Sequence, residues 1–330
     1  MVIRSETAIS KRLFLLIFVA IVLVGTSGIL YYSLSNYAAD DSGNNQKAPS
    51  YRPKFISALA GGGNQRLKGP MGIALGNDAL YVADSGSGHL VIISPTGTFK
   101  KVIDVSAQAG GARPVGVAVD RDMRIYVSTL GAEGAIFVYG SDGKFLYRFP
   151  EGASDEGSVS VLPGRPIALC AANEKLYVTD VLDQDVKVYD LKGRLITRFG
   201  RPGSDKGQFL YPNGITADRQ GTIYVSDSNN ARVQVFSGRG EFLNVVTGSE
   251  KEAMALPRGI ALDRGGRLHV VDMLKHKVFV FTKDGRFIST YGGFGTTGKG
   301  LAYPNGIAID TRNNEIFIAD KLNNRIAAWK

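Results

Sequence analysis

The sequence predicts an all-β protein, a six-bladed β-propeller, and two observations lead to this prediction. The first is composition: 41 of the 330 residues are glycine, and short runs of Val, Ile, Tyr and Phe recur along the chain. Tight turns between runs of β-branched and aromatic residues are typical of antiparallel sheets. The second is a repeat whose six copies are spaced by 44–52 residues, the length of one four-stranded blade.

An apolar segment precedes the repeats. Leu13–Val24 is an unbroken apolar run, and apolar character resumes after Gly25–Gly28. Residues 13–34 are long enough to cross the membrane as a helix. Lys11 and Arg12 precede the segment, so the positive-inside rule keeps the tail 1–12 in the cytoplasm and places the rest on the periplasmic or extracellular side. We therefore predict a single-pass signal-anchor. A cleaved signal peptide is the alternative, and both export the same domain.

Residues 35–52 are rich in Ser, Asn, Asp and Gly, which predicts a flexible linker. The repeats then occupy residues 53–330. The chain has 39 Lys and Arg against 30 Asp and Glu, which favours anionic partners, although the predicted export argues against nucleic acid. The single cysteine, Cys170, can form no internal disulfide, and its apolar neighbours predict a small buried core residue.

Each repeat begins with a proline that is followed, two positions later, by a small residue and an apolar run. The six prolines are Pro70, Pro114, Pro166, Pro212, Pro257 and Pro304. A second strand follows and ends at Asp84, Thr129, Asp180, Asp227, Asp272 and Asp320. A third strand comes next, such as Arg232–Phe236. Five copies continue through a turn that ends in glycine, suited to a tight hairpin, and a fourth strand.

The sixth repeat lacks a fourth strand, because the sequence ends at Trp329-Lys330. The segment Lys54–Leu59 closely matches Arg286–Tyr291, a fourth strand of the fifth repeat. We therefore expect the N-terminal strand to complete the last blade and to close the ring, which leaves no large exposed edge.

The segment from Phe199-Gly200 through Gly207-Gln208-Phe209, Pro212–Ile215, Ile223–Asp227 and Asn230–Phe236 strongly resembles the NHL repeat. The resemblance covers residues 53–330, and the fourth and sixth repeats are the most similar. It implies the membrane-anchored, bacterial type of six-bladed propeller. The second and third repeats depart from the pattern, with Thr129 in place of the aspartate and Ala168 in place of glycine, so we expect their loops to differ.

The loops before the prolines and those after the second strands should share one face, called here the top face. The glycine hairpins lie on the bottom face. The long connections 106–113, 150–165, 200–211, 248–256 and 292–303 all belong to the top face, where recognition is expected. The closing strand starts on the bottom face, so we expect the linker to enter there.

The residues after the prolines should ring the mouth of the central channel. They are Met71, Val115, Ile167, Asn213, Arg258 and Asn305. We predict a ligand site in which Arg258, flanked by Asn213 and Asn305, offers a polar wall to an anionic or carbonyl-bearing ligand. The alternative is that the asparagines cap their turns while Arg258 is solvated.

A second set of polar residues recurs in two blades and is expected to hold loops together. It consists of Asp227, Asn230 and Arg232, with Asp320, Asn324 and Arg325 as the counterparts.

Two enzyme classes share this architecture. The peptidyl-hydroxyglycine lyase group uses zinc held by three histidines, whereas His89, His269 and His276 do not occupy equivalent channel positions here, and His269 replaces a packing aromatic residue. The gluconolactonase-like propellers hold a divalent cation with carboxylates, and no rim position is Asp or Glu. We predict no catalytic residue, no metal site and no cofactor. The expected function is an extracytoplasmic binding or scaffold module for a protein, peptide or glycan; a metal-dependent hydrolase or lyase is the alternative.

Overall fold

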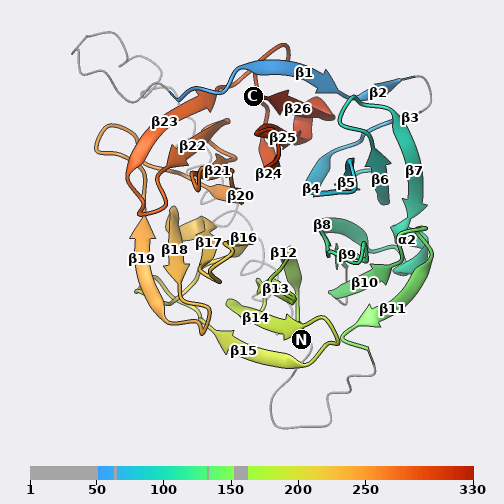
Figure 1. The fold of residues 1–330 in the computed structure, drawn as a ribbon, viewed down its shortest axis with the longest axis horizontal. Coiled ribbons are helices and arrows are strands. Elements are labelled where there is room, and N and C mark those ends of the chain that lie inside the picture. Colours follow the sequence, from blue (N-terminus) through green and yellow to red (C-terminus); the bar gives the residue numbers. More distant parts are fainter. Residues whose placement is uncertain (1–50, 63–64, 132–133, 152–162) are drawn as a thin grey trace, which may run out of the picture. The chain divides into compact units, whose positions relative to one another are not determined.

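The computed structural model describes residues 51–62, 65–131, 134–151 and 163–330. They fold into six antiparallel sheets of four strands, arranged around a central channel (Figure 1). This confirms the all-β, six-bladed propeller. The predicted apolar segment 13–34 lies outside the described residues, and none of the helices that are described has the length and apolar character to span a bilayer.

Blades 1 to 5 each use four consecutive strands, numbered here from the innermost outward. Blade 1 has β4 (Pro70–Gly76), β5 (Ala79–Asp84), β6 (His89–Ile93) and β7 (Phe99–Asp104); blade 2 has β8 (Arg113–Val119), β9 (Ile125–Leu130), β10 (Ala135–Tyr139) and β11 (Phe145–Phe149). Blade 3 has β12 (Pro166–Ala172), β13 (Lys175–Asp180), β14 (Asp185–Asp190) and β15 (Leu195–Phe199).

Blade 4 has β16 (Pro212–Ala217), β17 (Ile223–Asp227), β18 (Arg232–Phe236) and β19 (Phe242–Val246); blade 5 has β20 (Pro257–Leu262), β21 (Leu268–Asp272), β22 (Lys277–Phe281) and β23 (Phe287–Gly292). Blade 6 combines β24 (Pro304–Asp310), β25 (Glu315–Asp320) and β26 (Arg325–Trp329) with β1 (Phe55–Leu59). Smaller elements are β2 (Gly61–Gly62), β3 (Gln65–Arg66), α2 (Val105–Gln108), and the 3₁₀ turns η1 (Ser228–Asn230) and η2 (Lys321–Asn323).

The closing strand pairs as the sequence predicts. β1 runs antiparallel to β26, with Phe55 opposite Trp329 and Leu59 opposite Ile326. The rings of Phe55 and Trp329 pack edge to face at 5.6 Å, and Leu59 is buried. The first and last strands therefore hold the ring together through one sheet.

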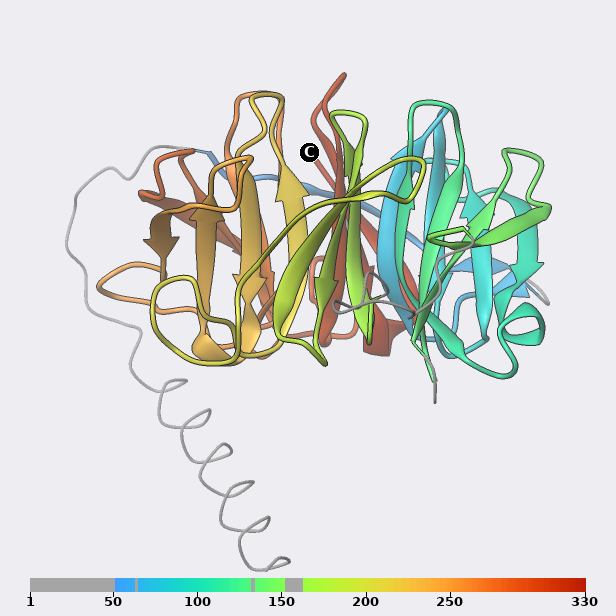
Figure 2. The same ribbon diagram turned by 90° about the horizontal axis from the view of Figure 1, so that it is seen from below.

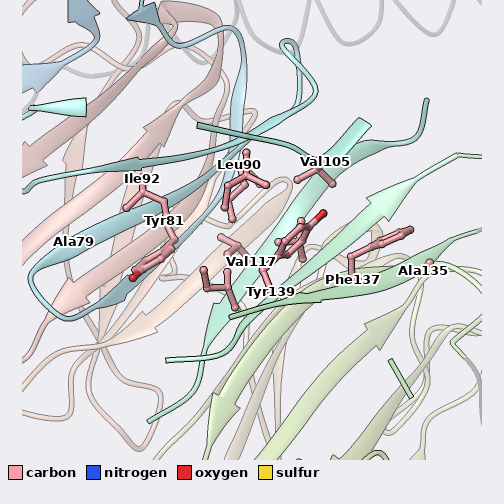
Figure 3. Packing of buried hydrophobic residues seen from close by; sticks show 13 residues of the cluster. Ala79, Tyr81, Leu90, Ile92, Val105, Val117, Ala135, Phe137 and Tyr139 are labelled. Carbon is pink, nitrogen blue, oxygen red and sulfur yellow. The ribbon is translucent and has the colours of Figure 1, made fainter. Parts of the chain in front are cut away.

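The core is divided among the interfaces between neighbouring blades. Between blades 1 and 2, Tyr81 and Leu90 pack with Val117, Phe137 and other apolar side chains (Figure 3). The second strands are almost wholly buried, because a blade covers each of their faces. The aromatic position of these strands is filled in five blades by Tyr or Phe and in blade 5 by the buried His269, as predicted.

The two faces are arranged as expected (Figure 2, in which the top face points downward). The outer hairpins of the bottom face end in glycines with φ between 76° and 94°, a conformation that favours glycine (Gly97, Gly143, Gly193, Gly240 and Gly285). On the top face, three of the long loops close on themselves through single bridges: Pro202 with Phe209, Gly248 with Ala253, and Phe294 with Leu301.

Tyr51, which the sequence places in the linker, packs against blade 5. Its ring lies 3.5 Å from the guanidinium of Arg267 and edge-on to His269, and its carbonyl accepts a hydrogen bond from Ser289 Oγ at 2.6 Å. Arg267 belongs to the turn between β20 and β21. The described chain therefore enters the propeller at the bottom face.

Candidate functional site: the channel mouth on the top face

Close backbone packing joins the six rim residues into a ring. The glycine that follows a rim residue lies against the carbonyl of the next rim residue. A Cβ atom added at Gly214 would lie 2.0 Å from the carbonyl oxygen of Arg258. One added at Gly259 would lie 2.5 Å from that of Asn305, and one at Gly306 would lie 2.4 Å from that of Met71. The small residue of the repeat is thus required by contact between blades. It also makes Asn213, Arg258 and Asn305 consecutive positions around the mouth.

Arg258 is the chemically distinctive member of this ring. Its Nε atom is buried and has no hydrogen-bond partner among the described residues. Burial lowers the pKa of the guanidinium, and no carboxylate nearby offsets that effect. A buried donor without a partner costs on the order of 1–3 kcal/mol, and more when it is charged. A ligand carboxylate or phosphate would remove this cost.

The two flanking asparagines differ. Asn213 Nδ2 donates to Tyr211 O at 2.7 Å and to Ser228 Oγ at 3.0 Å, so this amide caps its own turn. Ser228 Oγ in turn donates to the carbonyl of Pro257, next to Arg258. The side chain of Asn305 makes no hydrogen bond within the described part of the chain. The alternative in which an asparagine only caps its own turn therefore holds for Asn213. The side chains of Arg258 and Asn305 keep hydrogen-bonding groups that have no partner within the described residues.

Exposed apolar side chains gather in two groups on the loops of the top face. The first group, called the blade 3/4 patch, is Leu182, Leu210 and Tyr211, which are 38–60% exposed. The second, the blade 5/6 patch, is Leu274, Phe294, Tyr303 and Leu322, which are 37–69% exposed. The sequence analysis missed both patches. Their signal is a leucine two residues after the aspartate of three second strands, and a tyrosine directly before two of the prolines.

Each patch is held by the same contact between blades. Gln184 in blade 3 and His276 in blade 5 adopt left-handed conformations at φ 55° and 56°. Gln184 Oε1 accepts the N–H of Tyr211 at 2.5 Å, and His276 Nδ1 accepts the N–H of Tyr303 at 3.1 Å. His276 also contacts the rings of Phe294 and Tyr303 at 4.9 and 4.8 Å, and burial lowers the pKa of its imidazole.

The aspartates that end the second strands hold the top loops. Asp227 Oδ2 accepts from Asn230 Nδ2 and Arg232 Nε, both at 2.8 Å, and its other oxygen accepts the N–H of Leu210. In blade 6, the partners of Asp320 are Asn323 and Arg325, each at 2.7 Å.

These contacts are structural, as expected, but the counterpart of Asn230 is Asn323 and not Asn324. Both asparagines lie three residues after their aspartate. Asn324 instead accepts the N–H of Gly69 in blade 1 at 2.8 Å.

In blade 3, a largely buried cluster of charged side chains takes the place of the Asp, Asn and Arg contacts of blades 4 and 6. Asp180, Asp183 and Asp185 bring carboxylate oxygens within 4.8 Å of one another. Lys187 Nζ donates to all three, at 2.9, 2.6 and 3.0 Å, and is itself fully buried. The lysine ammonium supplies the positive charge that a metal ion would supply, so this group does not fit a cation.

The channel mouth does not fit a catalytic metal either. Its six rim side chains include no carboxylate or histidine, and the guanidinium of Arg258 would repel a divalent cation. The histidines are dispersed: His89 opens β6 rather than lying in a loop, and His276 contacts Tyr303. His269 is buried beside Asp263 and Tyr291, with burial lowering the pKa of the imidazole. We derive no metal-dependent step from these residues.

A cavity of about 790 Å³ occupies the part of the channel below the rim and reaches the bottom turns. Cys170 lies on the wall of this cavity and packs against the core between blades 3 and 4, where it is partly buried, whereas the sequence predicted a buried core residue. Desolvation by its surroundings raises the pKa of the thiol to about 11. Such a thiol is almost wholly protonated at neutral pH and therefore a weak nucleophile.

Comparisons with known proteins agree with the repeat assignment. Residues 209–236 match the NHL repeat, and residues 260–329 match a family described as a 6-bladed beta-propeller. The chain is 42% identical over 52 residues to Tripartite motif-containing protein 3 of Mus musculus, which is 16% of this chain and 7% of that protein. It is 47% identical over 45 residues to B-box type zinc finger protein ncl-1 of Caenorhabditis elegans, or 14% and 5% of the two chains. It thus spans only a small part of these relatives.

Solved structures resemble the whole propeller at low sequence identity. A streptogramin B lyase superposes with a TM-score of 0.62 at 14% identity, over 84% of this chain and 98% of that one. A gluconolactonase of Xanthomonas campestris gives a TM-score of 0.60 at 19% identity, over 88% and 98%. At such identities the likeness shows a shared fold, and the residues at the site must decide the chemistry.

Proposed function

Since the chain is a six-bladed β-propeller of the NHL-repeat type, we propose that it is a binding module whose top face takes a protein or peptide ligand carrying an acidic group. In this proposal the N-terminal segment 13–34 anchors the module in a membrane and places the propeller on the periplasmic or extracellular side. The partner's acidic group enters the channel mouth, and its apolar residues cover the two patches beside it.

The observation that carries the proposal is the Nε atom of Arg258, which is buried and has no hydrogen-bond partner in the described structure, while burial lowers the pKa of the guanidinium. A charged donor in this state is prepared for an anion, because most of the desolvation cost of binding has already been met in folding. Arginine is also one of the residue types that dominate binding energy at protein interfaces.

The apolar patches favour a polypeptide among the ligands considered. Leucine, tyrosine and phenylalanine side chains that are 37–69% exposed stand on the top loops of blades 3 to 6, and Arg258 belongs to blade 5. Contiguous exposed apolar surface on a rigid scaffold marks interaction sites. A segment that crosses the mouth could place an acidic side chain on Arg258 and apolar side chains on both patches.

A hydrolase or lyase, as named in the titles of the structural neighbours, is the second candidate. It is supported by the shared fold alone, because the rim residues provide no carboxylate or histidine for a metal. Titration calorimetry of the full chain with Ca²⁺ and Zn²⁺ separates the two. One tightly bound ion per chain would favour the enzyme.

An array of immobilised ten-residue peptides tests the binding proposal. Each peptide carries a central Glu, Asp, Gln or Asn between Leu, Tyr and Phe residues, and the full chain is applied in detergent without lipid. We expect binding to peptides with Glu or Asp, and at least a tenfold weaker affinity for the matched amides. Arg258→Met should abolish the preference, while Arg219→Gln on the bottom face should preserve it. Equal binding to acids and amides, or binding to none of the peptides, would contradict the proposal.

A further inference from the structure

The bottom face differs from the top face in charge. The eleven bottom turns, together with residues 51–54 and Lys330, contain fifteen Lys and Arg and nine Asp and Glu. None of the large exposed apolar side chains of the described structure lies in these segments. The bottom face is therefore basic and polar, whereas the top face carries the apolar patches.

The carboxylates of this face are almost all used in ion pairs. Eight of the nine lie within 4.0 Å of a Lys or Arg side chain of the same face, for example Asp78 with Arg312 and Asp218 with Lys283. Asp190 and Asp310, at the strand ends that lead into these turns, are paired as well. Glu241 is the exception among these nine, and Glu315, which begins β25 at the same face, forms no ion pair in the described structure either.

The basic residues are in excess, and several are free. Seven exposed side chains of the bottom face form no ion pair within the described structure: Arg52, Lys54, Lys192, Arg219, Arg239, Arg264 and Lys330. They come from blades 3, 4 and 5, from the entering segment and from the last residue of blade 6, whose backbone pairs with that of Lys54. The unpaired positive charge is thus spread over one half of the face and around the point where the chain enters.

The point of entry gives this charge a direction. Tyr51 is fixed on the bottom face by Arg267 and Ser289, so residues 1–50 join the propeller there. We propose that the bottom face docks on the anionic lipid surface of the membrane that holds the chain. This inference rests on the membrane anchorage in the proposed function, and it turns the top face with Arg258 away from the bilayer.

The linker has a suitable length for such docking. Sixteen residues, 35–50, separate the predicted anchor from Tyr51. With the flexibility predicted from its composition, a chain of this length would have a root-mean-square span of roughly 20–24 Å and would hold the propeller at a high local concentration near the surface. Lipid charge then acts on unpaired Lys and Arg side chains within a Debye length of roughly 8–10 Å. The docking should be reversible and sensitive to salt.

Energy transfer in nanodiscs measures the distance between the bottom face and the lipid. The full chain with Cys170→Ala and Ser141→Cys carries a donor dye in the turn between β10 and β11, and the acceptor is a headgroup-labelled lipid. A second protein carries the donor on the top face at Thr297→Cys. The discs contain phosphatidylcholine alone or a 7:3 mixture with phosphatidylglycerol.

A variant with Lys192, Arg219, Arg239 and Arg264 changed to Gln is compared with a control that loses the same charge from the top face, at Lys206, Lys251, Lys299 and Lys321.

We expect transfer from position 141 to rise at least twofold when phosphatidylglycerol is present, and transfer from position 297 to stay low. The rise should disappear in 0.5 M salt and in the bottom-face variant, and should persist in the top-face control. Equal transfer in both lipids, or equal loss in both variants, would overturn the docking. Failure of the chain to enter the discs would overturn it together with the anchorage, whereas the peptide array, which contains no lipid, would still test ligand binding.

Discussion

Gly214 in blade 4 lies so close to the carbonyl of Arg258 in blade 5 that a Cβ atom at position 214 would come within 2.0 Å of that oxygen. The glycine of the repeat in blade 4 thus fixes the backbone position of Arg258, the candidate ligand-binding residue in blade 5. The same close approach recurs from Gly259 to Asn305 and from Gly306 to Met71. The packing of the ring and the geometry of the channel mouth therefore depend on the same residues.

Gly214→Ala should destabilise the propeller and disturb the mouth together. The new methyl group would overlap backbone atoms that cannot rotate away, at a cost of about 3 kcal/mol or more. Urea unfolding measures the loss. Ala168→Gly, at the equivalent position of blade 3, is the control and should cost less than about 1 kcal/mol. An unchanged unfolding free energy for Gly214→Ala would show that the contact is not as close as described.

Leu59→Ala should weaken the closure of the ring. Leu59 is buried between β1 and blade 1 and lies opposite Ile326, so its truncation should cost about 2–4 kcal/mol. Ile56→Ala, on the same strand but 50% exposed, should change the unfolding free energy by less than about 0.5 kcal/mol. Equal effects of the two substitutions would show that β1 does not close the ring through its buried face.

Lys187→Met should leave three carboxylates of blade 3 with Arg198 as the remaining cation, which pairs with Asp183 and Asp185 but not with the buried Asp180. Removal of one partner from a buried ion cluster costs about 3–5 kcal/mol. The deficit, measured by chemical unfolding at pH 7, should shrink toward pH 5, because protonation of a carboxylate relieves the repulsion. Arg194→Gln, which removes an exposed ion pair with Asp190, is the control and should cost less than about 1 kcal/mol. A deficit that stays constant between pH 7 and pH 5 would contradict this account.

Asp263→Asn should change how the free energy of unfolding depends on pH at acidic pH. Desolvation opposes ionisation of Asp263, but hydrogen bonds from His269 and Arg267 outweigh it and lower the pKa to about 2. A lowered pKa stabilises the fold above the ordinary value near 3.8, and this contribution is lost as the pH falls toward 2. Asp263→Asn should therefore cost on the order of 2 kcal/mol at pH 6 and progressively less below pH 4. The same cost at pH 6 and pH 2.5 would contradict the assignment.

The repeat allowed the blades, their order and the closing strand to be predicted, because one pattern of proline, small residue and apolar run recurs six times. A ring of neighbours was therefore predictable at Asn213, Arg258 and Asn305. The state of their side chains was not. The turn-capping bonds of Asn213 and the buried, unpaired Nε of Arg258 depend on contacts with residues of adjacent loops and blades.

The apolar patches and the contacts beneath them were missed for a related reason. Gln184, His276 and Asn324 share a position four residues after the aspartate, yet they are different amino acids joined by a common left-handed backbone and an acceptor atom. A comparison of residue types does not group them. The pairing of Asn230 with Asn324 instead of Asn323 has a different cause, because two asparagines stand side by side in blade 6 and only the offset from the aspartate distinguishes them.

A charge-swap experiment, in which the charges of Arg258 and of the peptide's glutamate are reversed by substitution, tests the central claim most directly. Calorimetry would compare the full chain and Arg258→Glu, each with an acidic peptide from the array and with its Glu→Lys counterpart. We predict that the affinity of Arg258→Glu for the acidic peptide is at least a hundredfold weaker than that of the unmodified chain. Its affinity for the lysine peptide should be at least tenfold tighter than that of the unmodified chain. Undiminished affinity of Arg258→Glu for the acidic peptide would show that the ligand does not reach the channel mouth.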